Sequence, residues 1–147
     1  MLVLSGLILI LLVSGCSSQQ NAPSQQPGQN TGAQVSIPTP RAAFEGYRKA
    51  LTDKNLDSFL KYVSTSSIQG YESKIGKLDQ NSFNTIAYYA SMLPSVGNVV
   101  VVTENIQGDT ATWAVSDKTD SRKTGTITFV KENGQWKLNK EQWTQTN

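Results

Sequence analysis

Histidine is absent from this chain of 147 residues, and cysteine occurs once, at Cys16. These absences exclude an internal disulfide, a histidine general base and the usual ligand sets for zinc or haem, so we expect no metal and no cofactor. The chain has 13 Lys and Arg residues against 11 Asp and Glu residues. Because a formal charge of +2 gives only a weak field, we also expect no nucleic-acid partner.

The first forty residues carry no charged side chain, and the first charged residue of the chain is Arg41. Residues 2–13 read LVLSGLILILLV, a run too short for the ~20 residues of a spanning helix but typical of the core of a signal peptide. The next residues complete the sequence VSGC at positions 13–16, which resembles the bacterial lipobox. We expect cleavage before Cys16, acylation of its thiol, and a product anchored through lipid to the outer face of a bacterial-type membrane, inner or outer. The alternative is a plain secretory signal or an uncleaved anchor.

The chain divides into three parts by composition. Residues 1–15 form the predicted signal peptide. Residues 16–39 hold the lipidated cysteine and a stretch of Gln, Ser, Asn, Pro and Gly that has almost nothing to bury, so we expect a disordered tether. Residues 40–147 contain all the charged and all the aromatic residues, and their number suits one folded domain.

The first half of this domain has apolar residues at spacings of three and four, which predicts helices. Thr39 and Pro40 form a good helix start, because a hydroxyl cap precedes a proline at the first helical position. We expect a first helix there, a second helix capped by Asn55, and a third over residues 82–93. Residues 64–80 suit a short helix or a loop equally well.

The second half is rich in β-branched and aromatic residues, in four runs that are separated by turn residues. The predicted strands cover residues 98–106, 110–117, 124–132 and 136–143. Asn133 and Gly134 give the strongest hairpin signal, so we expect an antiparallel meander. Because residues 99–102 are apolar on both faces, we expect the first strand to be central in the sheet or covered on both sides.

Helices followed by a curved antiparallel four-stranded meander define an α+β fold class, and the order resembles the NTF2-like family of cone-shaped domains. Within that family the chain is similar to small lipoproteins of unknown function. The resemblance is carried by Phe44 and Tyr47 in the first helix and by residues 54–57, 108–111 and 126–138. It implies a fold and not an activity, because this fold carries enzymes, binding modules and scaffolds alike.

The resemblance also implies a pocket between the helices and the concave face of the sheet. The candidate lining residues are Tyr47, Phe59, Tyr62, Tyr88, Trp113, Phe129 and Trp136. The alternative, which we favour, is that these aromatic side chains fill the core of a small domain.

No acidic residue has a pattern that points to catalysis. Asp57 suits the first turn of a helix, where a negative charge favours the helix dipole. Turns explain Asp109, Asp117 and Asp120, because Asp is favoured there for backbone reasons. The basic group Lys118, Arg122 and Lys123 suits a solvated loop, with contact to a phosphate or a lipid headgroup as the alternative.

These observations predict a non-catalytic envelope lipoprotein that binds a small apolar ligand, a peptide or another envelope protein. One alternative is a scaffold that forms a homodimer through an exposed sheet face, which a contiguous apolar patch on that face would favour. A less favoured alternative is an isomerase or hydrolase, which would need a buried acid that faces an open cavity.

Overall fold

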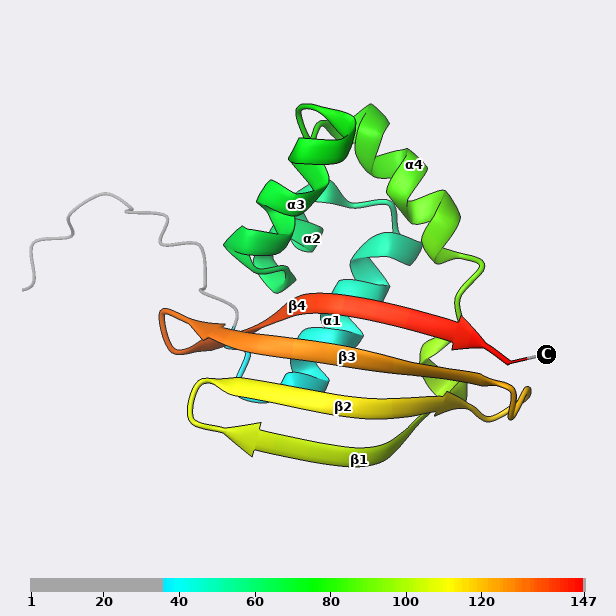
Figure 1. The fold of residues 1–147 in the computed structure, drawn as a ribbon. Helices are drawn as coiled ribbons and strands as arrows, with labels where there is room; N and C mark the ends of the chain where they lie inside the picture. The colour runs from blue at the N-terminus through cyan, green and yellow to red at the C-terminus, as the bar shows by residue number, and fades with distance from the viewer. Residues whose placement is uncertain (1–35, 147) are drawn as a thin grey trace, which may run out of the picture. The chain divides into compact units, whose positions relative to one another are not determined.

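A computed structural model describes residues 36–146, which form helices followed by a four-stranded antiparallel sheet (Figure 1). The helices are α1 (Pro40–Thr52), α2 (Leu56–Tyr62), α3 (Thr65–Ile75) and α4 (Gln80–Ala90), and a 3-10 turn, η1 (Val96–Asn98), leads into the sheet. The strands β1 (Val99–Gln107), β2 (Thr110–Asp117), β3 (Lys123–Glu132) and β4 (Gln135–Gln145) pair in that order. This architecture confirms the predicted α+β fold class, with helices packed on an antiparallel meander.

Part of the sequence prediction lies outside the described residues. The signal peptide, Cys16 and the tether up to residue 35 belong to that part. Within residues 36–146, no helix has the length and the apolar character needed to cross a membrane.

Each of the four described helices begins at a polar side chain that accepts a backbone N–H of its first turn: Thr39, Asn55, Ser64 and Asp79. Residues 64–80, for which the sequence allowed a short helix or a loop, begin with a helix that Ser64 caps. Its Oγ accepts the N–H of Ser67 at 3.2 Å, and α3 follows. None of the residues of α3 is fully buried, which explains why its apolar pattern is weak.

The position of β1 differs from the prediction, because β1 is an edge strand and not a central one. Val100 and Val102 are 42% and 62% exposed, so the strand is not covered on both sides either. The register with β2 shifts between Val101 and Thr103, which makes Val102 the extra residue of a β-bulge. An apolar run shows that a strand exists, but it does not show which neighbours the strand has.

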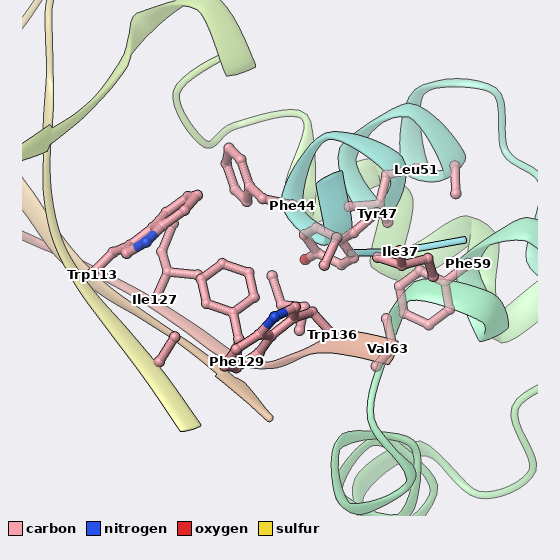
Figure 2. Packing of buried hydrophobic residues seen from close by; sticks show 14 of the residues in the cluster. Ile37, Phe44, Tyr47, Leu51, Phe59, Val63, Trp113, Ile127, Phe129 and Trp136 are labelled. Atoms are coloured by element: carbon pink, nitrogen blue, oxygen red, sulfur yellow. The ribbon is translucent and has the colours of Figure 1, made fainter. Parts of the chain in front are cut away.

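The core lies between the inner face of the sheet and the helices α1 and α2 (Figure 2), and α4 adds Phe83 and Ala87 to it. Trp113 and Phe129 project from neighbouring strands toward α1, and their ring centroids are 4.7 Å apart in an edge-to-face arrangement. Phe44 of α1 meets Trp113 in the same way at 5.8 Å. These aromatic contacts fix how α1 lies against the sheet.

Gly46 allows α1 and α2 to approach closely. A methyl group at this position would lie inside van der Waals contact with the ring of Tyr62. Ala normally stabilises a helix relative to Gly by about 1 kcal/mol. We nevertheless expect Gly46→Ala to lower the free energy of unfolding in urea by about 1–3 kcal/mol, because the helix and the ring must move apart.

The control for this substitution is Gly70→Ala in α3, where nothing lies within 4 Å of an added Cβ. It should raise the free energy of unfolding by about 0.5–1 kcal/mol. Equal effects of the two substitutions would contradict the steric explanation.

Candidate functional site

A charged pair lies inside the domain, between α1 and β4. Nη2 of Arg48 and Oε1 of Glu141 are 2.6 Å apart, and the two side chains are only 7% and 3% exposed. Removing two charges from water is costly, and their attraction offsets this cost only when the geometry is good and further hydrogen bonds are made. A pair buried this deeply is therefore a candidate for a functional role.

A β-bulge in β4 turns Glu141 toward the helices. The register between β3 and β4 shifts beside Leu138, so that Asn139 is inserted as an extra residue. Leu138 is buried on the inner face, and in a regular strand the residue three positions later would point to the outer face. The extra residue moves the alternation by one position, which places Glu141 on the inner face.

The beginning of α3 holds this bulge in place. The N–H of Ser64 donates to the carbonyl oxygen of Leu138 at 2.9 Å. The hydroxyls of Ser64 and Ser66 donate to Oδ1 of Asn139 at 2.9 and 2.7 Å. The hydroxyl of Ser67 donates to the carbonyl oxygen of Asn139. The contacts that start α3 therefore also fix the bulge.

Further hydrogen bonds connect the ion pair to its surroundings. Nη1 and Nη2 of Arg48 donate to the carbonyl oxygens of Ala90 and Pro94 at 3.4 and 3.3 Å. The indole N–H of Trp143 donates to Oε1 of Glu141 at 2.8 Å. Among the residues that the structure describes, two atoms of the pair are buried without a partner, Nε of Arg48 and Oε2 of Glu141. The pair thus keeps one unused donor and one unused acceptor.

Glu141 lines a cavity of about 370 Å³ between α3 and β4, which we call the α3–β4 cavity. Its lining residues are Ser66, Ser67, Gly70, Tyr71 and Lys74 from α3, and Leu138, Asn139, Lys140, Glu141 and Gln142 from β4. The volume lies within the range of roughly 300–1,000 Å³ that is usual for small-molecule sites. Most of the lining side chains are polar or charged.

Two tyrosine hydroxyls lie close to this carboxylate. Burial raises the pKa of Tyr47 well above its usual value, and the negative charge of Glu141 raises it further. Burial also raises the pKa of Tyr71, which lines the α3–β4 cavity. Both phenols therefore keep their protons at neutral pH and act as neutral hydrogen-bonding groups.

A second cavity, of about 510 Å³, is lined by the other member of the ion pair, Arg48. It is lined by Arg48, Leu51, Thr52 and Lys54 at the end of α1, and by Ala87, Tyr88, Ala90, Ser91, Leu93, Pro94, Ser95 and Val96. The pair thus contributes Arg48 to this cavity and Glu141 to the α3–β4 cavity. Within residues 36–146, no group of three or more carboxylates is placed to hold a metal ion.

The residues that the sequence suggested for a pocket are divided between the core and the surface. Five of them are core side chains that are 0–4% exposed: Tyr47, Phe59, Trp113, Phe129 and Trp136. Tyr62 is half-buried against Gly46, and Tyr88 is 61% exposed and lines the second cavity. Trp113 lines a third cavity, of about 330 Å³, beside the start of α1. The α3–β4 cavity is lined by none of the seven.

Two acids at turns have structural partners. Oδ1 of Asp117 accepts the N–H and the hydroxyl of Thr119, and Asp120 forms an ion pair with Arg122. Hydrogen bonds from Thr119 and Arg122 lower the pKa of the two carboxyls. These contacts stabilise the loop between β2 and β3.

The sequence analysis missed both members of the buried pair. A signal for Arg48 exists, because it lies four residues after Phe44 and three before Leu51, on the buried face of α1. A charge on such a face needs a partner. No comparable signal exists for Glu141, because simple alternation from Leu138 places it on the outer face.

The comparisons with known proteins concern the fold alone. Neither a family model nor a curated protein matches the chain. A solved structure from Thiobacillus denitrificans, described as a calcium/calmodulin-dependent protein kinase type II association domain, is similar to it with a TM-score of 0.48 and 18% identity. The match covers 77% of this chain and 99% of that chain.

The cost of burying the ion pair can be measured with a double-mutant cycle. Arg48→Met and Glu141→Leu each leave one charge buried and unpaired, so each should lower the free energy of unfolding by about 3–5 kcal/mol. The double variant R48M/E141L leaves no charge behind and should be close to the original protein in stability. Urea denaturation of the four proteins gives the coupling energy.

The matched control is the exposed pair Lys49 and Asp53, whose Nζ and Oδ2 atoms are also 2.6 Å apart. Lys49→Met and Asp53→Leu should show little coupling, because water screens exposed charges. If the effects of Arg48→Met and Glu141→Leu on the free energy of unfolding simply add, the two side chains are not coupled and the prediction is wrong.

Proposed function

We propose that this protein is a membrane-tethered, non-catalytic binding module that takes a small ligand in the α3–β4 cavity. The observation that carries the proposal is the α3–β4 cavity itself, whose volume of about 370 Å³ is usual for a small-molecule site and whose lining includes Glu141, a carboxylate held by Arg48 and Trp143.

The lining of the cavity favours a polar ligand over the apolar one that the sequence suggested. Leu138 is the one large aliphatic residue among the ten that line it. Most of the other lining residues carry a hydroxyl, amide or charged group, next to the apolar parts of their side chains. An apolar ligand would cover these groups without replacing their hydrogen bonds to water, which opposes binding.

A scaffold that dimerises through its outer sheet face has less support. The paired residues on that face include Thr112 with Thr128 and Ala114 with Thr126, which are small or polar. The exposed valines, Val100 and Val102, lie on the edge strand β1. An apolar patch in the middle of the face, which would favour a dimer, is not formed by these described residues.

An enzyme that transfers protons is the second candidate, because Glu141 is a buried acid on a cavity wall near Tyr47 and Tyr71. Its Oε1 already accepts hydrogen bonds from Arg48 and Trp143, which hold the carboxylate in one orientation. That arrangement suits recognition of a ligand, and Oε2 alone would have to act as the base.

The membrane tether is proposed from the sequence. The apolar run before Cys16 and the small residues at positions 14 and 15 are typical of a lipoprotein signal. The predicted tether would end before Ile37, because Ile37 is buried in the core of the domain. A flexible segment from residue 16 to that point would have a root-mean-square length on the order of 25 Å, which would hold the domain clear of the lipid headgroups.

We expect the protein from host membranes to have the mass of the chain from Cys16 onward plus acyl groups, and Cys16→Ser to abolish this product. Intact-mass spectrometry of the membrane fractions that contain the original protein and the Cys16→Ser variant tests this prediction. An unmodified mass, or a soluble product cut at another position, would contradict the anchor and leave the proposal for the cavity untouched.

Ligand binding can be tested with a fragment library and amide chemical shifts. We expect polar fragments to shift the amides of residues 66–74 and 138–142. Gly70→Phe should abolish these shifts, because the added ring enters the cavity from a position where a Cβ meets nothing within 4 Å. The control Gln69→Phe adds the same ring to an exposed residue next to it and should leave binding intact. The site would be refuted if fragments bind the two variants equally, or if no fragment shifts these amides.

A further inference from the structure

A long stretch of the folded domain carries no charge. Charged residues occur throughout the chain from Arg41 onward, but residues 80–103, which lie between Asp79 and Glu104, contain none. These residues form α4, η1 and the first part of β1. The exposed face of a surface helix normally carries charged as well as polar side chains, which water solvates well. The missing charges mark the surface that this stretch forms as a candidate contact surface.

Large side chains are exposed where α4 ends. Tyr88, Tyr89 and Met92 are 61%, 63% and 58% exposed, and Val96 is exposed as well. The chain keeps turning after α4, because the N–H of Met92 donates to the carbonyl oxygen of Tyr89 at 3.2 Å. Met92 thus follows the two tyrosines at spacings of three and four, which places it beside them. The centroids of the two tyrosine rings are 5.6 Å apart. We call these four residues the α4 surface.

A lysine lies beside the α4 surface at the second cavity. Tyr88 and Val96 line this cavity together with Lys54, and none of the described residues in its lining is acidic. Lys54 is exposed and belongs to no ion pair among the described residues. Its ammonium group is therefore available to an anionic partner.

The loop between β2 and β3 adds a second lysine. The N–H of Lys118 donates to the carbonyl oxygen of Asn98, the last residue of η1, at 2.7 Å. Lys118 is exposed and, within residues 36–146, is in no ion pair, whereas the nearby Asp120 is paired with Arg122. An uncharged aromatic surface with lysines next to it is typical of a protein surface that lies at the boundary of an anionic bilayer.

The proposed tether indicates a bilayer rather than a free protein as the partner. A domain that is tied to a membrane by a short flexible segment meets that membrane at a high effective concentration, so a weak contact is sufficient. Tyrosine suits this contact, because its ring is apolar and its hydroxyl stays in the wet headgroup layer. A protein in solution has no such advantage over other partners.

The tether is long enough for this contact. The domain begins beside β4, where the carbonyl oxygen of Ile37 accepts the N–H of Trp136 at 3.1 Å. The α4 surface lies toward the other end of the sheet, where η1 leads into β1 (Figure 1). A strand of the length of β3 spans about 33 Å. The predicted tether, when fully extended, spans about 65 Å and could reach from one end of the sheet to the other.

We infer that the α4 surface rests on the bilayer to which the protein is anchored. Tyr88, Tyr89 and Met92 lie at the level of the lipid headgroups, and Lys54 and Lys118 face anionic phosphates. This inference rests on the membrane tether of the proposed function and is independent of the α3–β4 cavity. It gives the domain one orientation, in which the turn between β1 and β2 points away from the lipid.

A fluorescent label tests the contact directly. Because Cys16 is the only cysteine, Cys16→Ser combined with Met92→Cys leaves one site for an environment-sensitive dye. A His tag in place of residues 1–15 attaches the chain to vesicles of phosphatidylcholine and phosphatidylglycerol that contain a nickel-chelating lipid. We expect the emission to rise several-fold and to shift to shorter wavelength on the vesicles. The control Asp109→Cys, in the exposed turn between β1 and β2, should show no change.

Variants assign the contact to its residues. Tyr88→Ser with Tyr89→Ser should abolish the change at position 92, and the fold should persist in circular dichroism because both side chains are exposed. Lys54→Gln and Lys118→Gln should each lower the ratio of docked to free domains about fivefold on anionic vesicles. The control Lys61→Gln, an exposed lysine of α2 outside the lining of the second cavity, should leave this ratio unchanged.

Other partners would give different results. Equal changes at positions 92 and 109, or no change at either, would refute the bilayer contact. A change at position 92 that develops without vesicles as the protein concentration rises would show that a second copy covers the surface. A change that needs host membranes and is absent on pure lipid would show a protein partner. Either result would also overturn the inference.

The design separates this inference from the proposed anchor. Because the His tag replaces the acyl groups, the emission change does not depend on acylation of Cys16. An acylated mass with no change at position 92 would refute the contact and leave the anchor standing. An unmodified mass would refute the anchor whatever the label shows.

Discussion

The contact between Arg48 and Glu141 is the constraint on which the rest of the domain depends. It connects α1 with the middle of β4, and Arg48 also binds the carbonyl oxygens of Ala90, the last residue of α4, and of Pro94 beyond it. Because a buried charge is costly whenever its partner moves away, these elements cannot shift separately without a large loss of stability. The pair therefore fixes the positions of the helices relative to the last strand.

The same pair explains why a cavity and a charged acceptor occur together. The extra residue at Asn139 points Glu141 inward, and the hydroxyls of Ser64 and Ser66 hold Asn139 at the start of α3. The bulge thus sets the distance between α3 and β4 as well as the direction of the carboxylate. If β4 had no bulge, Glu141 would point to the outer face, and both the ion pair and the carboxylate of the cavity lining would be absent.

Much of the fold could be predicted because it depends on local chemistry. Thr39 and Asn55 cap helices where the sequence placed them, and Asn133 and Gly134 both have the positive φ that a tight hairpin turn requires. The position of β1 in the sheet could not be predicted. The valines of β1 satisfy the pattern of a buried strand, but an edge strand also has one inner face to cover, and strand order depends on contacts that are distant in sequence.

The candidate site was harder to predict than the fold, because side chains of a strand alternate between its two faces and a bulge interrupts that alternation. Arg48 could have been found, since a helix with Phe44 and Leu51 on its buried face must turn Arg48 inward as well. Glu141 could not, because its face depends on whether one residue is inserted after Leu138. That insertion is stabilised by serines some seventy residues away in the chain. A bulge reverses the face of every residue that follows it, so a rule based on alternation fails where the functional side chain lies.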